Sequence, residues 1–189
     1  MPSIQKAFEN FHEVIAGKET EKSNYVPYKP ALTVVICGKR HHARIFATAE
    51  DDADRTANPK AGLVVDRGIT HPYDFDFYLQ AHAGLQGTTR STHYTVVYDE
   101  NKLSADDIQQ GTNTLCYLWA RATKSVSLAP PAYWADIACE RGRCYIREIL
   151  PPPPDSADSK LDKKGIWRRA EELLGNGVHG NLKDTMFYL

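Results

Sequence analysis

The sequence has no segment that could cross a membrane, since no run approaches the roughly 18 consecutive apolar residues that a spanning helix needs. Its N-terminus also lacks the basic, apolar and small-residue succession of a secretory signal. The charge shows no excess of either sign: 23 Lys and Arg stand against 24 Asp and Glu, for a formal net charge of -1. Overall charge therefore predicts no attraction to nucleic acid or to an acidic membrane, and any such binding must come from local patches. These absences favour a cytoplasmic protein, with the nucleus as the alternative location.

Cysteine is also scarce. The four cysteines, at positions 37, 116, 139 and 144, form no C-x-x-C pair, which argues against a zinc finger or a redox motif. They suit reduced and mostly buried thiols. With 189 residues, of which 42% are hydrophobic and 25% charged, the chain has the composition of one ordinary globular domain and is long enough to enclose a hydrophobic core.

Four segments rich in β-branched and aromatic residues predict strands in the first half of the chain, at 31–37, 62–69, 75–81 and 92–98. The first is almost continuously apolar, as expected of a strand that is buried on both faces. The polar, acidic residues 50–60 predict an exposed loop.

Helices are predicted mainly after the strands. Ser104 and Asp107 resemble a capping box that opens a helix extending to Trp119, and Pro130 with Pro131 opens another that ends near Arg147. Further helices are predicted at 4–15, from one apolar face, and at 166–174, before the breaker residues 175–177.

A basic segment, Lys39 to Arg44, directly follows the first predicted strand. In an extended chain Arg40, His42 and Arg44 share one face, and such a row suits phosphates spaced along a backbone. A solvated strand end with a charged tail explains the same residues. A zinc site on the histidine pair is less favoured, because neighbouring strand residues point in opposite directions and no other ligand accompanies them.

A second candidate is the segment His82 to Arg90, in which glycines let backbone amides approach a ligand between Gln, His and Arg donors. As a phosphate loop this signal is weak, because the segment lacks the P-loop spacing and its lysine. A turn with surface donors is the simpler interpretation.

The helix after Pro131 carries Tyr133, Asp136 and Arg141. At about 100° per residue, Tyr133 and Arg141 fall near one face, whereas Asp136 lies roughly 140° around the helix from Arg141. An isolated Asp on such a helix is most often a solvated surface group, and a metal-ligand role is the less frequent alternative.

Seven groups of residues, taken in order, carry a specific pattern: Lys39 to Arg44, Val65-Asp66 with His71-Pro72, Asp74 to Leu79, His82 to Thr88, Thr114 to Tyr117, Ser125 to Ser127 with Pro130 to Tyr133, and Met186 to Leu189. Together they resemble the C-terminal part of the PIWI domain of a eukaryotic Argonaute. We therefore expect residues 1–189 to be the C-terminal portion of that domain, with flexible insertions at about 49–57 and 151–165.

The resemblance implies an α/β, ribonuclease-H-like fold, in which a mixed sheet is flanked by helices and of which this chain holds only the C-terminal portion. It implies an RNA-silencing protein that holds a small guide RNA and pairs it with a complementary target RNA, with silencing-complex proteins as further partners and no membrane. By resemblance, the residues that line the guide backbone are Lys39, Arg40, His42, Arg44, His82, Gln86, Arg90, Arg121, Ser127 and Tyr133, and Arg141 reaches the guide 5′ phosphate.

Cleaving members of the family cut the target with divalent metal, Mg²⁺ or alternatively Mn²⁺. Asp136 matches one position of their four-residue catalytic site, and it is the only one that we assign to this chain. One ligand cannot hold a metal ion, so we expect the isolated chain to be inactive. The intact parent is then either a guide-directed endoribonuclease or a non-cleaving RNA-binding scaffold that acts through partners. An inactive truncated product is a further alternative.

Overall fold

The computed structural model describes residues 29–147 without a gap, together with residues 4–6, 8, 164, 165, 168, 171, 172, 179–182 and 185–188. The residues described within the predicted helices 4–15 and 166–174 are helical. The rest of these two helices, the breaker at 175–177 and most of the predicted insertion at 151–165 lie outside the described residues. No helix among the described residues is both long and apolar enough to cross a membrane.

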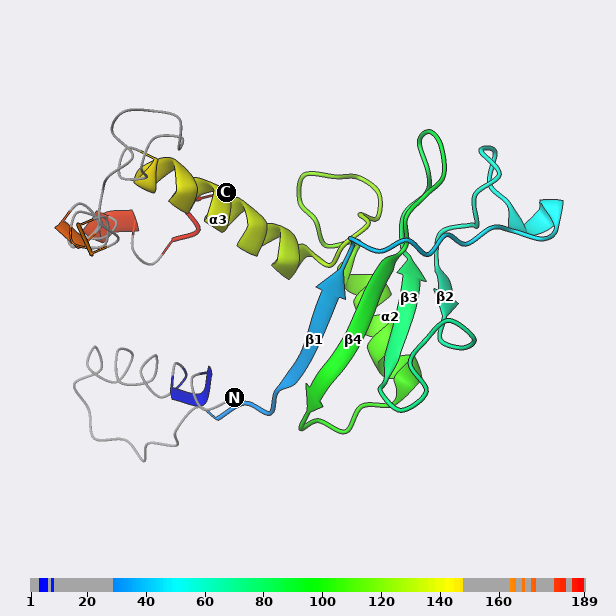
Figure 1. Cartoon of the computed structure of the whole chain (residues 1–189), viewed down its shortest axis with the longest axis horizontal. Helices are drawn as coiled ribbons and strands as arrows, with labels where there is room; N and C mark the ends of the chain where they lie inside the picture. Colours follow the sequence, from blue (N-terminus) through cyan, green and yellow to red (C-terminus); the bar gives the residue numbers. More distant parts are fainter. Residues whose placement is uncertain are drawn as a thin grey trace.

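The centre of the molecule is a sheet of β1 (Thr33–Gly38), β2 (Leu63–Val65), β3 (Asp76–Gln80) and β4 (Thr92–Asp99), in the order β1-β4-β3-β2 (Figure 1). The strand pairs among the described residues are all antiparallel. Any parallel pairing of a mixed sheet would therefore have to come from outside them. The predicted strand at 62–69 is too long, because the chain turns after Val65 and Gly68 adopts a left-handed φ of 81°.

Helix α2 (Ala105–Leu115) begins with the predicted capping box: the Ser104 hydroxyl accepts the Asp107 backbone N–H, and the Asp107 carboxylate accepts that of Ser104. The predicted extension to Trp119 is wrong. Tyr117 and Leu118 bond to carbonyls only three residues back, so the chain tightens into turns and leaves the helix axis. Helix α3 (Pro130–Ile146) begins at the two prolines, as predicted. Two short 3-10 helices complete the described elements, η1 (Glu50–Asp52) and η2 (Gly180–Leu182).

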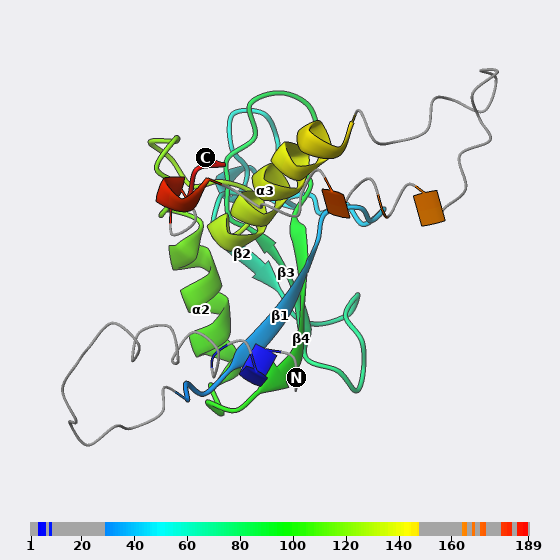
Figure 2. The ribbon, with the colours of Figure 1, turned by 90° about the vertical axis from the view of Figure 1, so that its left-hand side faces the viewer.

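The side chains of β3 are apolar on one face of the sheet and mostly polar on the other, because successive side chains of a strand point to opposite sides. Phe77 and Leu79 enter the hydrophobic core with Tyr94 and with Ile108 of α2, and the Phe77 and Tyr94 rings stack with centroids 5.4 Å apart. Figure 2 shows α2 lying along this face of the sheet. The expected arrangement of strands covered by a helix is confirmed.

The opposite face of β3 carries buried polar and aromatic groups. Asp76 is 5% exposed and lies 2.6 Å from Nε2 of His93. His93 in turn stacks on Tyr78, with ring centroids 4.4 Å apart. His41, from the segment after β1, packs edge-on against the Tyr78 ring at 5.2 Å. The basic segment therefore folds over this polar face instead of extending into solvent.

The cysteines are free, as expected, but only two of them fit the prediction of buried thiols. Cys116 is buried and Cys37 half-buried, and burial raises the pKa of both thiols. Cys139 and Cys144 are exposed on α3, which extends away from the sheet (Figure 1).

Candidate nucleic-acid interface

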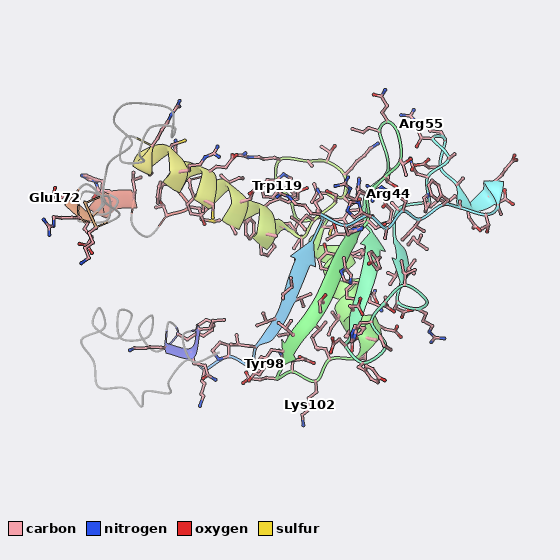
Figure 3. All side chains as sticks on the ribbon, in the orientation of Figure 1. Arg44, Arg55, Tyr98, Lys102, Trp119 and Glu172 are labelled. Carbon is pink, nitrogen blue, oxygen red and sulfur yellow. The ribbon has the colours of Figure 1, made fainter. Side chains whose placement is uncertain are left out.

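Three segments that are far apart in the sequence meet at one end of the sheet. The basic segment 39–44 follows β1, the connection 81–91 joins β3 to β4, and residues 116–129 lead from α2 into α3. Antiparallel pairing brings the end of β1 beside the start of β4 and the end of β3. Figure 3 shows Arg44 and Trp119 at this end, whereas Tyr98 and Lys102 mark the opposite end.

Lys39, Ser127 and Tyr133 are in direct contact at this end of the sheet. The Lys39 Nζ atom lies 3.5 Å from the Tyr133 hydroxyl and 5.6 Å from the centroid of its ring. The Ser127 hydroxyl lies 3.0 Å from the same Tyr133 oxygen. A lysine ammonium over an aromatic face is attracted to the ring and so held in place. Three of the predicted site residues therefore form one cluster of hydrogen-bonding groups.

Trp119 extends this cluster. Its ring centroid lies 5.1 Å from that of Tyr133, and the Arg121 guanidinium lies 6.0 Å from the Trp119 ring. Trp119 thereby connects the predicted residue Arg121 to the cluster. Sequence reasoning missed Trp119 because it placed this residue at the end of an extended α2. A tryptophan two residues before an arginine, Trp119 and Arg121, was the signal that could have identified it.

The backbone of the cluster is fixed by bonds to the sheet. The Ala129 N–H, at the N-cap of α3, donates to the Tyr94 hydroxyl at 3.2 Å, and the Thr92 hydroxyl donates to the Ser127 carbonyl. The Tyr94 pKa is raised, chiefly because the phenol is buried. Tyr94 therefore stays protonated and positions the start of α3.

The basic segment does not form the predicted extended row. Strand β1 ends at Gly38, and the Arg44 guanidinium turns back to donate to the carbonyls of His41 and Ala43, at 3.1 and 2.7 Å. These carbonyls have left the sheet and need a donor. Arg40 and His42 remain exposed. The predicted extended row is therefore wrong, because the chain leaves the strand and Arg44 satisfies its carbonyls. A contact between Arg44 and a guide stays a prediction.

A cleft of about 920 Å³ opens beside the cluster. It contains the predicted residues His82, Gln86 and Arg90, and it adds Lys124 from the segment before α3. The residues around it are Asp54, Arg55, His82, Ala83, Gly84, Leu85, Gln86, Thr88, Thr89, Arg90, Ala122, Lys124 and Ser125. The structure thus brings the glycine-containing segment and the segment after α2 to one concave surface.

The ends of the segment 82–90 are held by a buried side chain of β3. Gln80 is 1% exposed, donates to the His82 carbonyl at 2.7 Å and accepts from the Ser91 hydroxyl at 3.0 Å. The Ser91 carbonyl in turn lies 2.7 Å from Nε2 of His41. Gln80 and His41 therefore connect the cleft to the basic segment through one hydrogen-bonded chain, although neither was among the predicted site residues.

The His82 imidazole is kept neutral by its surroundings. Burial lowers its pKa, and the nearby positive charge of Lys39 lowers it further. No carboxylate within residues 29–147 forms an ion pair with Lys39 or Arg121 of the cluster, or with Arg90 or Lys124 of the cleft. The ion pairs in that range join Asp66 to Arg67, His71 to Asp74 and Asp76 to His93. The interface is therefore cationic despite the near-zero net charge of the chain.

Asp136 and Arg141 lie apart from this cluster, exposed on α3. Arg141 is two helical turns beyond Tyr133, or roughly 12 Å along the axis. No three His, Cys, Asp or Glu side chains gather into a metal-ligand set in the part of the chain that the structure describes. The described residues therefore do not form a metal site by themselves, and we assign them no metal-dependent reaction step.

Comparison with known proteins gives a consistent result. Residues 10–147 match the Piwi domain. Protein argonaute 5 of Arabidopsis thaliana is 42% identical over 180 residues, which cover 94% of this chain and 18% of that protein. Protein argonaute 10 of the same plant is 52% identical over 164 residues, which cover 85% of this chain and 17% of that protein. The crystal structure of Kluyveromyces polysporus Argonaute with a guide RNA covers 100% of this chain and 21% of that one, with a TM-score of 0.73 and 31% identity. The chain thus spans less than a fifth of the length of these two curated relatives.

Proposed function

Because this chain belongs to the Argonaute family of Piwi-domain proteins, we propose that the candidate interface holds the sugar-phosphate backbone of a small guide RNA within an RNA-silencing protein. The guide would in turn pair with a complementary target RNA. The solved Argonaute that this chain resembles was crystallised with a guide RNA, which supports the ligand class.

The observation that carries the proposal is the gathering of Lys39, Tyr133, Ser127 and Arg121 beside a cleft that contains Arg90. Cationic groups without a carboxylate partner attract phosphates, and hydroxyls bond phosphate or the ribose 2′-OH. Such contacts ignore base identity. A protein that must accept many guide sequences needs this kind of contact, because base pairing supplies the specificity.

The proposal predicts a salt-dependent affinity for single-stranded RNA. If about four side chains contact phosphates, the plot of log affinity against log salt should have a slope of roughly -3, at about -0.7 per contact for a single strand. Fluorescence anisotropy with a 21-nucleotide RNA of arbitrary sequence measures it. Lys39→Gln and Arg121→Gln should each weaken binding and reduce the slope by about 0.7.

Arg67→Gln is the matched control for the charge change. Arg67 is exposed, lies 4.0 Å from Asp66 and follows β2 rather than entering the interface. Its loss should leave affinity and slope unchanged. Equal losses of RNA affinity in Arg67→Gln and Arg121→Gln would indicate non-specific charge attraction and would contradict a defined interface.

We further propose that the intact parent cleaves the target RNA with Mg²⁺ and that Asp136 contributes one carboxylate ligand there, Mn²⁺ being the alternative ion. Hard Mg²⁺ prefers oxygen ligands, which suits an aspartate. The competing proposal is a non-cleaving scaffold that silences through recruited proteins.

A cleavage assay on the full-length protein separates the nuclease from the scaffold: Asp136→Ala should abolish Mg²⁺-dependent cutting while guide retention persists. Retained cutting in the variant would remove Asp136 from the mechanism, and no cutting by the unchanged protein would favour the scaffold.

A further inference from the structure

We propose that Asn58 is a positioning residue for this interface, which clamps the connection between β3 and β4 in the shape that presents Gln86 and Arg90 to RNA. The inference rests on the proposed function, since it assigns a cause to the geometry of the cleft. It gives the acidic loop at 50–58 a role in the interface beyond the one cation, Arg55, that this loop adds to the cleft.

Asn58 is 2% exposed and bonds across the cleft segment with both ends of its amide. Its Nδ2 donates to the Gly87 carbonyl at 2.8 Å, and its Oδ1 accepts the Thr89 backbone N–H at 2.8 Å. The Thr89 hydroxyl also lies 3.3 Å from Oδ1. One buried side chain therefore holds two backbone groups that stand on either side of Thr88.

Asp54 holds Asn58 in place. Its Oδ1 accepts the backbone N–H groups of Thr56 and Asn58, at 2.8 and 3.0 Å, and the Thr56 hydroxyl. The nearby backbone of Gly84, in the cleft segment, further favours the charged form of this carboxylate. These donors lower the pKa of Asp54, so the carboxylate is ionised and bonded at neutral pH.

Two backbone features show that the loop 50–58 and the cleft segment 82–90 pack closely against each other. Ala57, directly before Asn58, has a φ of 59°, a left-handed conformation that an alanine adopts only when its surroundings enforce it. Gly84 lies so close that a Cβ there would stand 2.7 Å from Asn58 Nδ2 and 2.7 Å from Thr89 Cγ2. The clamp thus contacts the cleft segment at Gly84, Gly87 and Thr89.

The tip of the cleft segment has little else to order it. Leu85 is 88% exposed, and Gln86, Gly87 and Thr88 are exposed as well. Within the described part of the chain, the hydrogen bonds of residues 84–89 go to Asn58. Without the clamp, Gln86 and Arg90 would sample many positions, and RNA binding would have to order them.

A double-mutant cycle between Asn58 and Arg90 tests the proposal on the whole chain. Asn58→Leu should weaken affinity for the 21-nucleotide RNA about three- to tenfold, and Arg90→Gln should do the same. It should also reduce the salt slope by about 0.7. The double variant should be little weaker than either single variant, because the clamp acts through Arg90 and its neighbours. Fully additive losses, or no loss in Asn58→Leu, would overturn the proposal.

Asn101→Leu is the matched control for a purely structural loss. Asn101 also bridges two segments, since its Nδ2 donates to the Thr33 hydroxyl at 2.9 Å and the Ala31 carbonyl at 3.3 Å, but it lies at the opposite end of the sheet. It should lower stability and leave RNA affinity unchanged. Should Asn58→Leu fail to fold, Gly84→Ala displaces the clamp from the other side and should give the same loss of affinity and slope.

Amide hydrogen exchange separates failure of the clamp from failure of the proposed function. Exchange at the Thr89 amide should accelerate in Asn58→Leu, or in Gly84→Ala, while exchange in β4 stays slow. If the unchanged chain bound no RNA but Thr89 exchange accelerated, the proposed function would fail and the clamp would stand. Unchanged exchange at Thr89 would refute the clamp whatever the RNA affinity.

Discussion

At the scale of single residues, the interface is built from side chains whose properties are set by their neighbours. Lys39 is held over the Tyr133 ring and lies close enough to His82 to lower the pKa of that imidazole. His82 was predicted as one more guide contact of the same kind as Lys39. A neutral imidazole instead offers one donor and one acceptor, which suit a hydroxyl as well as a phosphate.

Replacing Lys39 with methionine should raise the pKa of His82 toward its ordinary value, because one of the two causes of the lowered pKa is then removed. An NMR titration of the imidazole measures it. Lys102→Met, at the other end of the sheet (Figure 3), removes an equal charge and should leave the His82 pKa where it was. A His82 pKa that is the same in all three proteins would refute the coupling.

The same shift predicts the direction of the pH dependence of stability. The folded chain takes up the His82 proton at a lower pH than the unfolded chain does. The contribution of neutral His82 is therefore complete above the unfolded value of about 6.5 and is lost as the pH falls from there through the lowered folded pKa. Urea unfolding at several pH values should show this loss in the unchanged chain and less of it in His82→Gln.

At the scale of elements, local chemistry predicted where helices begin better than where strands and helices end. The Ser104 capping box and the two prolines of α3 act on their own backbone, so sequence alone identifies them. The end of α2 at Leu115 depends on the following segment folding back onto it, where the Val126 N–H bonds to the Cys116 carbonyl at 2.9 Å. Such long-range bonds have no local signal.

Loss of the capping box should destabilise α2 by a measurable amount. In Ser104→Ala the free energy of unfolding should fall by about 1 kcal/mol, because the Asp107 N–H loses its acceptor. Urea denaturation gives the value. Thr123→Ala removes a hydroxyl from an exposed position between α2 and α3 and should cost less than about 0.5 kcal/mol. Equal costs at the two positions would indicate that the cap contributes nothing.

At the scale of the whole molecule, large apolar side chains remain exposed while the net charge is close to zero. Phe46 is 64%, Leu118 62% and Ile36 56% exposed. Exposed apolar surface with little net charge promotes association. The chain on its own is therefore expected to associate rather than to remain a dilute monomer.

Light scattering at increasing protein concentration tests this expectation. Phe46→Glu should reduce association, because it removes exposed apolar surface and adds a charge. Thr123→Glu adds the same charge without removing apolar surface and should reduce association less. A cooperative melt of a monomer at all concentrations would contradict the expectation.

The amino-acid sequence by itself determined the four strands, the two helix starts and the family resemblance, because strand patterning, caps and motifs are properties of neighbouring residues. The tertiary structure alone decided that Arg44 turns back on its own loop, that Trp119 joins Tyr133, and that Asn58 holds a segment about thirty residues away. It also decided that a chain with a net charge of -1 has a cationic end. The physical reason is antiparallel pairing, which brings distant segments to one end of the sheet, where their side chains compete for the same partners.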